Sequence, residues 1–256
     1  MNKAYLLSTA GAAIALAAFT FGFTASDTRP ASADTKLDRA QVEEIVRNYL
    51  LKNPEILLEV QDALETKQKE EQKLAASGVI KENKDEIFNA SYDTVVGNPK
   101  GKITIVEFYD YNCGFCKRAM ADMADLTKAN PDLRFVLKEF PILGPDSQKA
   151  HVVSQAFQKL MPEKAGEFHL ELLGGQTRAT EETAIKIALE LGADEAKLRE
   201  AMKDPAIMER FAKTYDLANK LAITGTPSYV IGNEVVFGAL GADVLTEKIK
   251  AAKPTL

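Results

Sequence analysis

The sequence predicts an α/β protein in which a strand–helix–strand unit and a later β-hairpin enclose a long series of helices. Residues 102–109 are apolar and β-branched, as expected of a buried strand, and a helix at 117–126 and a second strand at 133–140 follow. Elements in this order imply two parallel strands. Strand-like segments return at 227–231 and 234–237, where the Gly-Asn between them favours a tight hairpin turn.

Between these two parts the chain is predicted to be helical throughout. Proline, glycine and aspartate separate successive helical segments in an insertion at about 145–223. The predicted helices span 147–160, 164–173, 181–191, 194–202 and 205–221, and a last helix spans 242–252. This pattern assigns residues 91–256 to one domain with a helical insertion.

The N-terminal region, residues 34–90, is charged, almost free of glycine and helical in pattern. Apolar residues recur on one helical face at 42–49. After this helix, Asn53 is the expected N-cap and Pro54 the expected first residue of a second helix, about 54–76. The region is therefore predicted to contain two amphipathic helices.

Two amphipathic helices without a sheet bury little apolar surface by themselves. Residues 37–90 therefore have two interpretations: an oligomerisation stalk that forms a homo-oligomer, or a helical arm folded back on its own domain. The sequence leaves monomer, dimer and trimer open.

Residues 1–33 are predicted to be a signal peptide. Lys3 supplies a positive charge, an uncharged apolar run spans 4–24, and Ala31-Ser32-Ala33 provides a small-residue cleavage site before Asp34. The competing interpretation is an uncleaved anchor, since about 20 apolar residues can span a bilayer. In both cases the folded part is exported.

The charge balance argues against two classes of function. The chain carries 32 Lys and Arg against 37 Asp and Glu, a formal net charge of −5 at pH 7. A net negative chain matches neither nucleic acid nor an anionic membrane surface. We expect no nucleic-acid partner and expect proteins as partners.

Cys113 and Cys116 are the only two cysteines in the chain. A structural disulfide normally closes a longer loop, because a four-residue loop constrains the unfolded chain little. The spacing instead allows one thiolate to attack a mixed disulfide formed by the other. The pair is therefore the best candidate for the site of chemistry.

Cys113 lies at the predicted junction between strand and helix. Backbone amides and the positive dipole end of a helix stabilise an anion there, and such settings lower a thiol pKa from about 8.5 to about 3.5–7.5. Cys113 is thus the expected nucleophile and Cys116 the resolving thiol. His151 and His169 have no cysteine or carboxylate at ligand spacing, so we expect no metal site and no cofactor.

Strand, Cys-x-x-Cys, helix and strand, followed much later by Thr-Pro before a hairpin, resemble the thioredoxin superfamily, and the helical insertion resembles its DsbA branch. The segments VEFYDYNCGFC (106–116), KEFPILG (138–144), GTP (225–227) and YLLKNPE (49–55) look like the DsbA-like periplasmic proteins of the ScsC type. The resemblance covers nearly all of the chain after the signal peptide. It implies a thioredoxin fold with an inserted helical domain and an N-terminal helical extension.

The resemblance also implies roles for further residues. Pro227 matches the family's cis-proline, which faces the disulfide and, with Thr226, docks a substrate strand. Glu107, six residues before Cys113, matches the family's buried acid beneath the active site. The alternative is an edge-facing strand glutamate, and a buried Glu107 would need a partner such as Lys138.

The leading hypothesis is a periplasmic thiol-disulfide oxidoreductase that forms, reduces or isomerises disulfides in exported proteins and is reset by a membrane redox partner. A threonine before the proline and a stalk resemble isomerase and reductase members, whereas monomeric relatives act as oxidases, so the direction stays open. A different class is a Cu(I)-binding or copper-tolerance protein, because two thiolates suit Cu(I). A third is a structural bridge in an adhesin or surface antigen.

Overall fold

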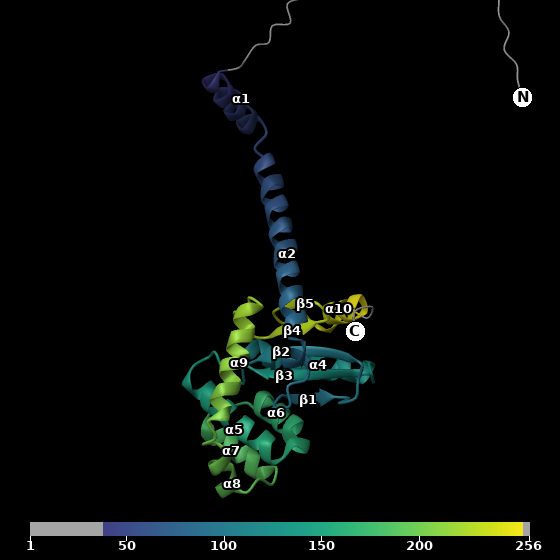
Figure 1. Ribbon diagram of the computed structural model, residues 1–256, viewed down its shortest axis with the longest axis vertical. Coiled ribbons are helices and arrows are strands. Elements are labelled where there is room, and N and C mark those ends of the chain that lie inside the picture. The colour runs from purple at the N-terminus through teal and green to yellow at the C-terminus, as the bar shows by residue number, and fades with distance from the viewer. Residues whose placement is uncertain (1–37, 253–256) are drawn as a thin grey trace, which may run out of the picture. The chain divides into compact units, whose positions relative to one another are not determined.

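The computed structural model describes residues 38–252 and divides into two units, 1–57 and 58–256, which are treated separately here (Figure 1). The predicted signal peptide at 1–33 lies outside the described residues. No helix in the described part of the chain is long and apolar enough to cross a bilayer. The sheet, the helical insertion and the cysteine pair all belong to the second unit.

Within residues 38–252, five strands form one mixed sheet in the order β1-β3-β2-β4-β5. Strands β2 (Ile103–Tyr109) and β3 (Leu133–Glu139) are parallel, as predicted. Strands β4 (Ser228–Ile231) and β5 (Glu234–Phe237) form the predicted hairpin. The sequence did not predict β1 (Thr94–Gly97), because a four-residue edge strand carries little periodic signal.

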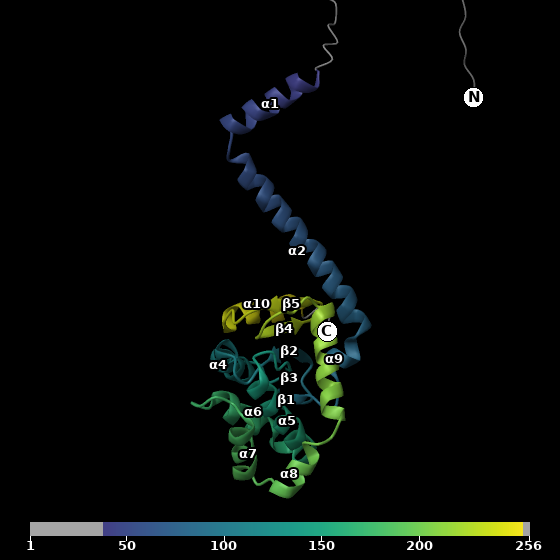
Figure 2. The same ribbon diagram turned by 90° about the vertical axis from the view of Figure 1, so that its left-hand side faces the viewer.

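The helices of the insertion begin and end within two residues of their predicted bounds. They are α5 (Pro145–Leu160), α6 (Ala165–Gly174), α7 (Glu181–Glu190), α8 (Glu195–Ala201) and α9 (Ala206–Lys220), and a short 3₁₀ helix that was not predicted, η1 (Pro162–Lys164), lies between α5 and α6. Helix α5 packs against α6, α7 and α8. In both views α5, α7 and α8 gather near the β1 edge of the sheet, and the last helix, α10 (Ala242–Ala252), lies near the β5 edge (Figures 1 and 2).

The remaining helices precede the sheet or follow β2. They are α1 (Arg39–Lys52), α2 (Ile56–Glu82), α3 (Lys84–Phe88) and α4 (Gly114–Ala129). Helix α4 joins the two parallel strands, as a βαβ unit requires. The predicted α/β fold, with its helical insertion and N-terminal helical extension, is therefore confirmed.

Strand β2 is buried on both faces, and its alternate side chains enter two separate cores. Ile105 and Tyr109 belong to the larger core, which includes residues of α4, α5 and α10. Val106 and Phe108 belong to the second core, with residues of α2, α3 and α9. Because side chains alternate along a strand, Glu107 lies on the face of the larger core.

The first unit contains α1, which begins with a capping box. The Asp38 carboxylate accepts the backbone N–H of Gln41 at 2.8 Å, and the Gln41 side chain accepts the N–H of Asp38 at 3.1 Å. The prediction that Asn53 caps the second helix is wrong. Its side-chain amide donates to the Tyr49 carbonyl at 2.8 Å, so Asn53 closes α1 instead, and α2 starts only at Ile56.

Both N-terminal helices expose apolar side chains. Helix α1 buries none of its residues, and α2 buries only Ala76 and Ile80, which are near its C-terminal end. The exposed apolar residues are Val42, Ile45, Val46, Tyr49 and Leu51 on α1, and Leu57, Leu58, Val60, Leu64 and Leu74 on α2. These stripes have the composition of a surface that another chain could cover.

Candidate active site

The cysteine pair lies where β2 ends and α4 begins. Cys113 is the N-cap of α4, and its Sγ accepts a hydrogen bond from the backbone N–H of Cys116 at 3.4 Å. Both residues are free thiols. Cys116 is fully buried in the first helical turn, whereas Cys113 keeps 6% of its surface exposed, so a partner molecule reaches Cys113 first.

The two thiols differ strongly in acidity. Hydrogen bonding from Cys116 lowers the pKa of Cys113 to about 5; burial opposes this shift, and hydrogen bonds from Thr226 and from the amides of Cys116 and Phe115 add to it. The same contact between the thiols, together with burial and the charge of Glu107, raises the pKa of Cys116 well above its usual value. At neutral pH the reduced site therefore holds a Cys113 thiolate beside a protonated Cys116.

A loop that is distant in sequence faces Cys113. The Thr226–Pro227 peptide bond is cis, and the Thr226 carbonyl oxygen lies 3.2 Å from Cys113 Sγ, across 113 positions of sequence. The carbonyl oxygen of Pro227 accepts the backbone N–H of Gly238 at 2.9 Å, which ties the loop to the end of β5. The fold thus brings Thr226 and Pro227 next to Cys113.

Glu107 lies inside the sheet on the same face as the cysteines. It is 2% exposed, sits between Leu137 of β3 and Tyr229 of β4, and has one carboxylate oxygen without a hydrogen-bond partner among the described residues. Burial, with smaller contributions from Cys113 and Asp122, raises the pKa of Glu107 to about 8. The interpretation of Glu107 as an edge-facing glutamate is therefore wrong.

Lys138 is not the partner of Glu107. The parallel register places Lys138 beside Phe108, and Leu137 beside Glu107, so Lys138 points to the opposite face of the sheet. There its ammonium group lies 2.6 Å from Asp93 Oδ2 and also donates to the Glu86 carbonyl. A shift of one residue along a strand exchanges the two faces, and Lys138 lies one register position beyond Leu137, the neighbour of Glu107.

Asp110 and Asn112, which precede Cys113, hold this turn in place through hydrogen bonds. The sequence alone did not predict a role for either residue. Asp110 is fully buried and accepts hydrogen bonds from the Asn112 amide at 2.7 Å, the Ser147 hydroxyl at 2.8 Å and the Leu143 amide at 2.9 Å. The Asn112 side chain both donates to and accepts from the Ala179 backbone, each at 2.9 Å. Asp and Asn beside a turn are typical of such bonding, so a signal was present.

A buried network of hydrogen bonds also holds the turn that precedes Cys113. His151 Nε2 accepts the backbone N–H of Tyr111 at 3.3 Å, and its Nδ1 lies 3.0 Å from a Glu139 oxygen. Since Nε2 accepts, Nδ1 carries the proton and donates to Glu139. His169 is also buried, which lowers its pKa to about 3, and neither of its ring nitrogens has a hydrogen-bond partner among residues 38–252. Both histidines are core residues.

Family models and solved structures agree on what the chain resembles. A model described as a DSBA-like thioredoxin domain matches residues 104–250, and one described as the copper resistance protein ScsC N-terminal domain matches residues 38–71. A thioredoxin-like oxidoreductase from Silicibacter pomeroyi is 37% identical with a TM-score of 0.64, covering 68% of this chain and 99% of its own. Proteus mirabilis ScsC in a transitional conformation is 28% identical with a TM-score of 0.62, covering 88% of this chain and 100% of its own.

Curated proteins extend this comparison. Disulfide bond formation protein D of Bacillus subtilis is 28% identical over 166 residues, which are 61% of this chain and 75% of that protein. A Na(+)/H(+) antiporter NhaA of Salinispora tropica is 24% identical over 161 residues, which are 62% of this chain but only 24% of the antiporter. The chain therefore spans about a quarter of the length of that relative. The chain belongs to the DSBA-like thioredoxin domain family and carries an N-terminal region of the ScsC type.

Proposed function

We propose that this protein is a periplasmic thiol-disulfide oxidoreductase that acts on cysteines of other exported proteins. The observation that carries the proposal is the pairing of Cys113, whose pKa is lowered to about 5, with the buried Cys116, whose pKa is raised. A low pKa makes Cys113 a thiolate at neutral pH and a good leaving group. The family assignment and the predicted signal peptide at 1–33 support the periplasmic location.

The reaction starts when the Cys113 thiolate attacks one sulfur of a substrate disulfide and releases a substrate thiolate. Cys116 then loses its proton, attacks the Cys113 sulfur, releases the second substrate thiolate and closes the Cys113–Cys116 disulfide. The substrate gains two electrons and the protein loses them, so a membrane redox partner has to restore the dithiol. The reverse sequence oxidises a substrate, and attack by a released substrate thiolate on another bond isomerises it.

Glu107 is proposed as the positioning residue for the proton of Cys116. Its pKa of about 8 supports this role, as does its carboxylate oxygen that has no hydrogen-bond partner in the described part of the chain, and its charge raises the pKa of Cys116. We expect Glu107→Gln to slow the attack of Cys116 on a preformed mixed disulfide by roughly tenfold at pH 8–9, where the ionised Glu107 carboxylate can accept the proton of Cys116, and by less at pH 6, where Glu107 is protonated. Stopped-flow rates between pH 6 and 9 test this. An unchanged rate and pH profile would remove Glu107 from the mechanism.

Thr226 and Pro227 are proposed to dock the substrate as an added strand. The proposal is supported by the Thr226 carbonyl oxygen, which lies 3.2 Å from the nucleophilic sulfur. A substrate backbone that pairs with this segment would be held by main-chain hydrogen bonds next to Cys113. Such binding depends little on side chains, which suits a broad set of client proteins.

The N-terminal helices are proposed to form a homo-oligomer through residues 37–90, which favours isomerase or reductase activity. The exposed apolar stripes of α1 and α2 support this reading. Tyr49→Asp should lower the solution mass toward that of a single chain. Asn48→Asp adds the same charge at the preceding position and should leave the solution mass unchanged. A wild-type protein that already sediments as a monomer would exclude the oligomer and favour an oxidase.

The activity itself is tested with the full mature chain and an insulin reduction assay. We expect Cys113→Ser to abolish reduction and Cys116→Ser to accumulate mixed disulfides, because only the resolving step is blocked. Titration of the reduced protein with Cu(I) against a competing chelator tests the copper alternative. Tight Cu(I) binding without insulin reduction would overturn the oxidoreductase proposal, and weak binding with rapid reduction would exclude the copper carrier.

A further inference from the structure

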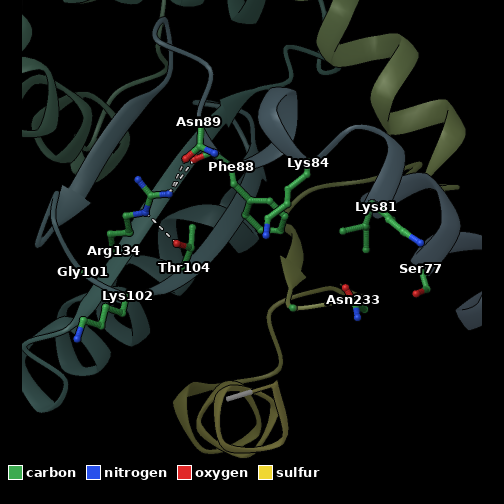
Figure 3. Close-up of a pocket in the computed structure, with 12 residues that line it drawn as sticks. Ser77, Lys81, Lys84, Phe88, Asn89, Gly101, Lys102, Thr104, Arg134 and Asn233 are labelled. Carbon is green, nitrogen blue, oxygen red and sulfur yellow. Dashed lines mark hydrogen bonds between the residues drawn. The ribbon is translucent and has the colours of Figure 1, made fainter. Parts of the chain in front are cut away.

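A second concave site lies at the end of the sheet opposite to the cysteines. It is a cavity of about 390 Å³ between the C-terminal part of α2, α3, the starts of β2 and β3, and the β4–β5 turn (Figure 3). Thr104 and Arg134 are register partners at this end of the sheet, whereas Cys113 follows the far end of β2. At about 3.3 Å per residue, Thr104 is already about 17 Å from Tyr109 along the strand. The cavity is therefore separate from the dithiol.

The charges around this cavity have one sign. Among the described residues, those that line it include Lys81, Lys84, Lys102 and Arg134 and contain no aspartate or glutamate. Within residues 38–252, none of these four cations has a carboxylate within salt-bridge distance. The chain as a whole is acidic, with a net charge of −5, so four uncompensated cations around one cavity run against its composition. Such a concentration of positive charge favours an anion.

Arg134 is held in place without losing its charge. Its Nε donates to the Thr104 hydroxyl at 2.8 Å, and Nη2 donates to the Phe88 carbonyl and to Asn89 Oδ1, both at 3.0 Å (Figure 3). All three acceptors are neutral, so they fix the guanidinium group and leave its positive charge uncancelled. A fixed, planar and uncompensated guanidinium is a pre-organised group for an oxyanion.

The three lysines complete the site from two parts of the fold. Lys81 and Lys84 come from α2 and α3 on one side of the cavity, and Lys102 lies beside Arg134 on the other (Figure 3). All three are exposed, and their flexible stems allow the ammonium groups to turn towards a bound charge. Asn233 and Ser77 add polar groups at the rim. An anion bound here would contact both the helices that carry Lys81 and Lys84 and the end of the sheet next to Lys102 and Arg134.

We propose that this cavity binds a small multivalent oxyanion of the phosphate class. Its tetrahedral, highly charged oxygens match several separate cations, whereas a single carboxylate would satisfy only one or two of them. The interaction is electrostatic, so it weakens as salt rises. The proposal is independent of the redox function, because the site shares no residue with the cysteine turn.

The test uses inorganic pyrophosphate and the mature full-length chain in calorimetric titrations at 50 and 300 mM NaCl. We expect saturable binding at low salt. The triple variant Lys81→Gln/Lys84→Gln/Lys102→Gln should weaken binding about tenfold or more, since it removes three of the four cations that line the cavity within residues 38–252. A control variant with the same change in charge replaces three exposed lysines elsewhere, Lys186→Gln/Lys203→Gln/Lys250→Gln. It should change the affinity for pyrophosphate by less than about twofold, because salt screens the interaction between distant charges.

Amide chemical shifts locate the site independently of affinity. Pyrophosphate should perturb residues 77–89, 101–104, 134 and 233, and leave the cysteine turn unchanged. Thermal unfolding verifies that both triple variants fold, and insulin reduction by the cavity variant should equal that of the wild type. Absence of saturable binding, equal weakening in the two triple variants, or shifts centred on 110–116 would each overturn the proposal.

Discussion

Glu107 and Lys138 are both buried, charged residues on the two central strands, yet their surroundings are opposite. Lys138 lies 2.6 Å from Asp93 and donates to a backbone carbonyl, whereas Glu107 faces the cysteines and has one carboxylate oxygen without a hydrogen-bond partner within residues 38–252. The two residues lie on opposite faces of one sheet. The comparison teaches what a nearby cation changes: Asp93 lies beside Lys138, yet burial still raises its pKa to about 7, whereas burial raises the pKa of Glu107, which has no cation beside it among the described residues, to about 8.

Glu107 and Lys138 are both buried, but in the described part of the chain only Lys138 has an opposite charge beside it. This difference decides how burial affects each residue. Removing a charge from water costs several kcal/mol unless an opposite charge or hydrogen bonds compensate for it. Lys138 has that compensation and is expected to be structural. Glu107 lacks it, so burial raises its pKa to about 8 and places its titration near neutral pH. Perturbed groups of this kind gather at functional sites.

The largest expected effect comes from breaking the paired charge. Lys138→Met should destabilise the fold by about 3–5 kcal/mol, because it leaves the Asp93 carboxylate buried without its partner. Urea unfolding at pH 7 measures the change. The double variant Asp93→Leu/Lys138→Met should recover most of the loss, since both charges are then removed. Equal instability of the single and double variants would mean that packing, and not the charge pair, explains the effect.

Glu107 predicts that the stability of the fold depends on pH. The folded-state pKa of Glu107 is raised from 4.5 to about 8, so its contribution to stability is full below pH 4.5 and is lost as the pH rises to about 8. Glu107→Gln cannot ionise and should gain stability relative to the wild type across this range, by about 2–4 kcal/mol. Paired unfolding curves of the reduced proteins at pH 5 and pH 8 show this gain. A constant difference at both pH values would contradict the raised pKa.

The smallest effect concerns the neutral hydrogen bonds that hold the cysteine turn. Asn112→Ala removes both side-chain contacts with the Ala179 backbone and should cost about 1–2 kcal/mol of unfolding free energy. Asn48→Ala, on the exposed face of α1, is the matched control and should cost less than about 0.5 kcal/mol. Because these bonds do not involve Glu107, the effects of Asn112→Ala and Glu107→Gln should add. Strong non-additivity would show that the turn and the buried acid act as one unit.

Much of the fold was predictable because its elements carry strong local signals. The apolar run of β2, the hairpin turn at Gly232-Asn233 and the helix boundaries of the insertion all follow from residue types at regular spacing. Strand β1 was missed because it is short and at an edge. Asn53 was assigned to the wrong helix because the same side chain can close one helix or start the next, and only the backbone path distinguishes the two.

The sequence by itself predicted the cysteine pair, the strand–helix–strand unit, the hairpin and the helices of the insertion, because these depend on spacing along the chain. Only the tertiary structure decided which distant groups meet that pair. Strand register placed Glu107 on the cysteine face and turned Lys138 away from it, and the folded loop brought the Thr226 carbonyl within 3.2 Å of Cys113. These decisions depend on which face each side chain occupies, and a face is a property of the assembled sheet.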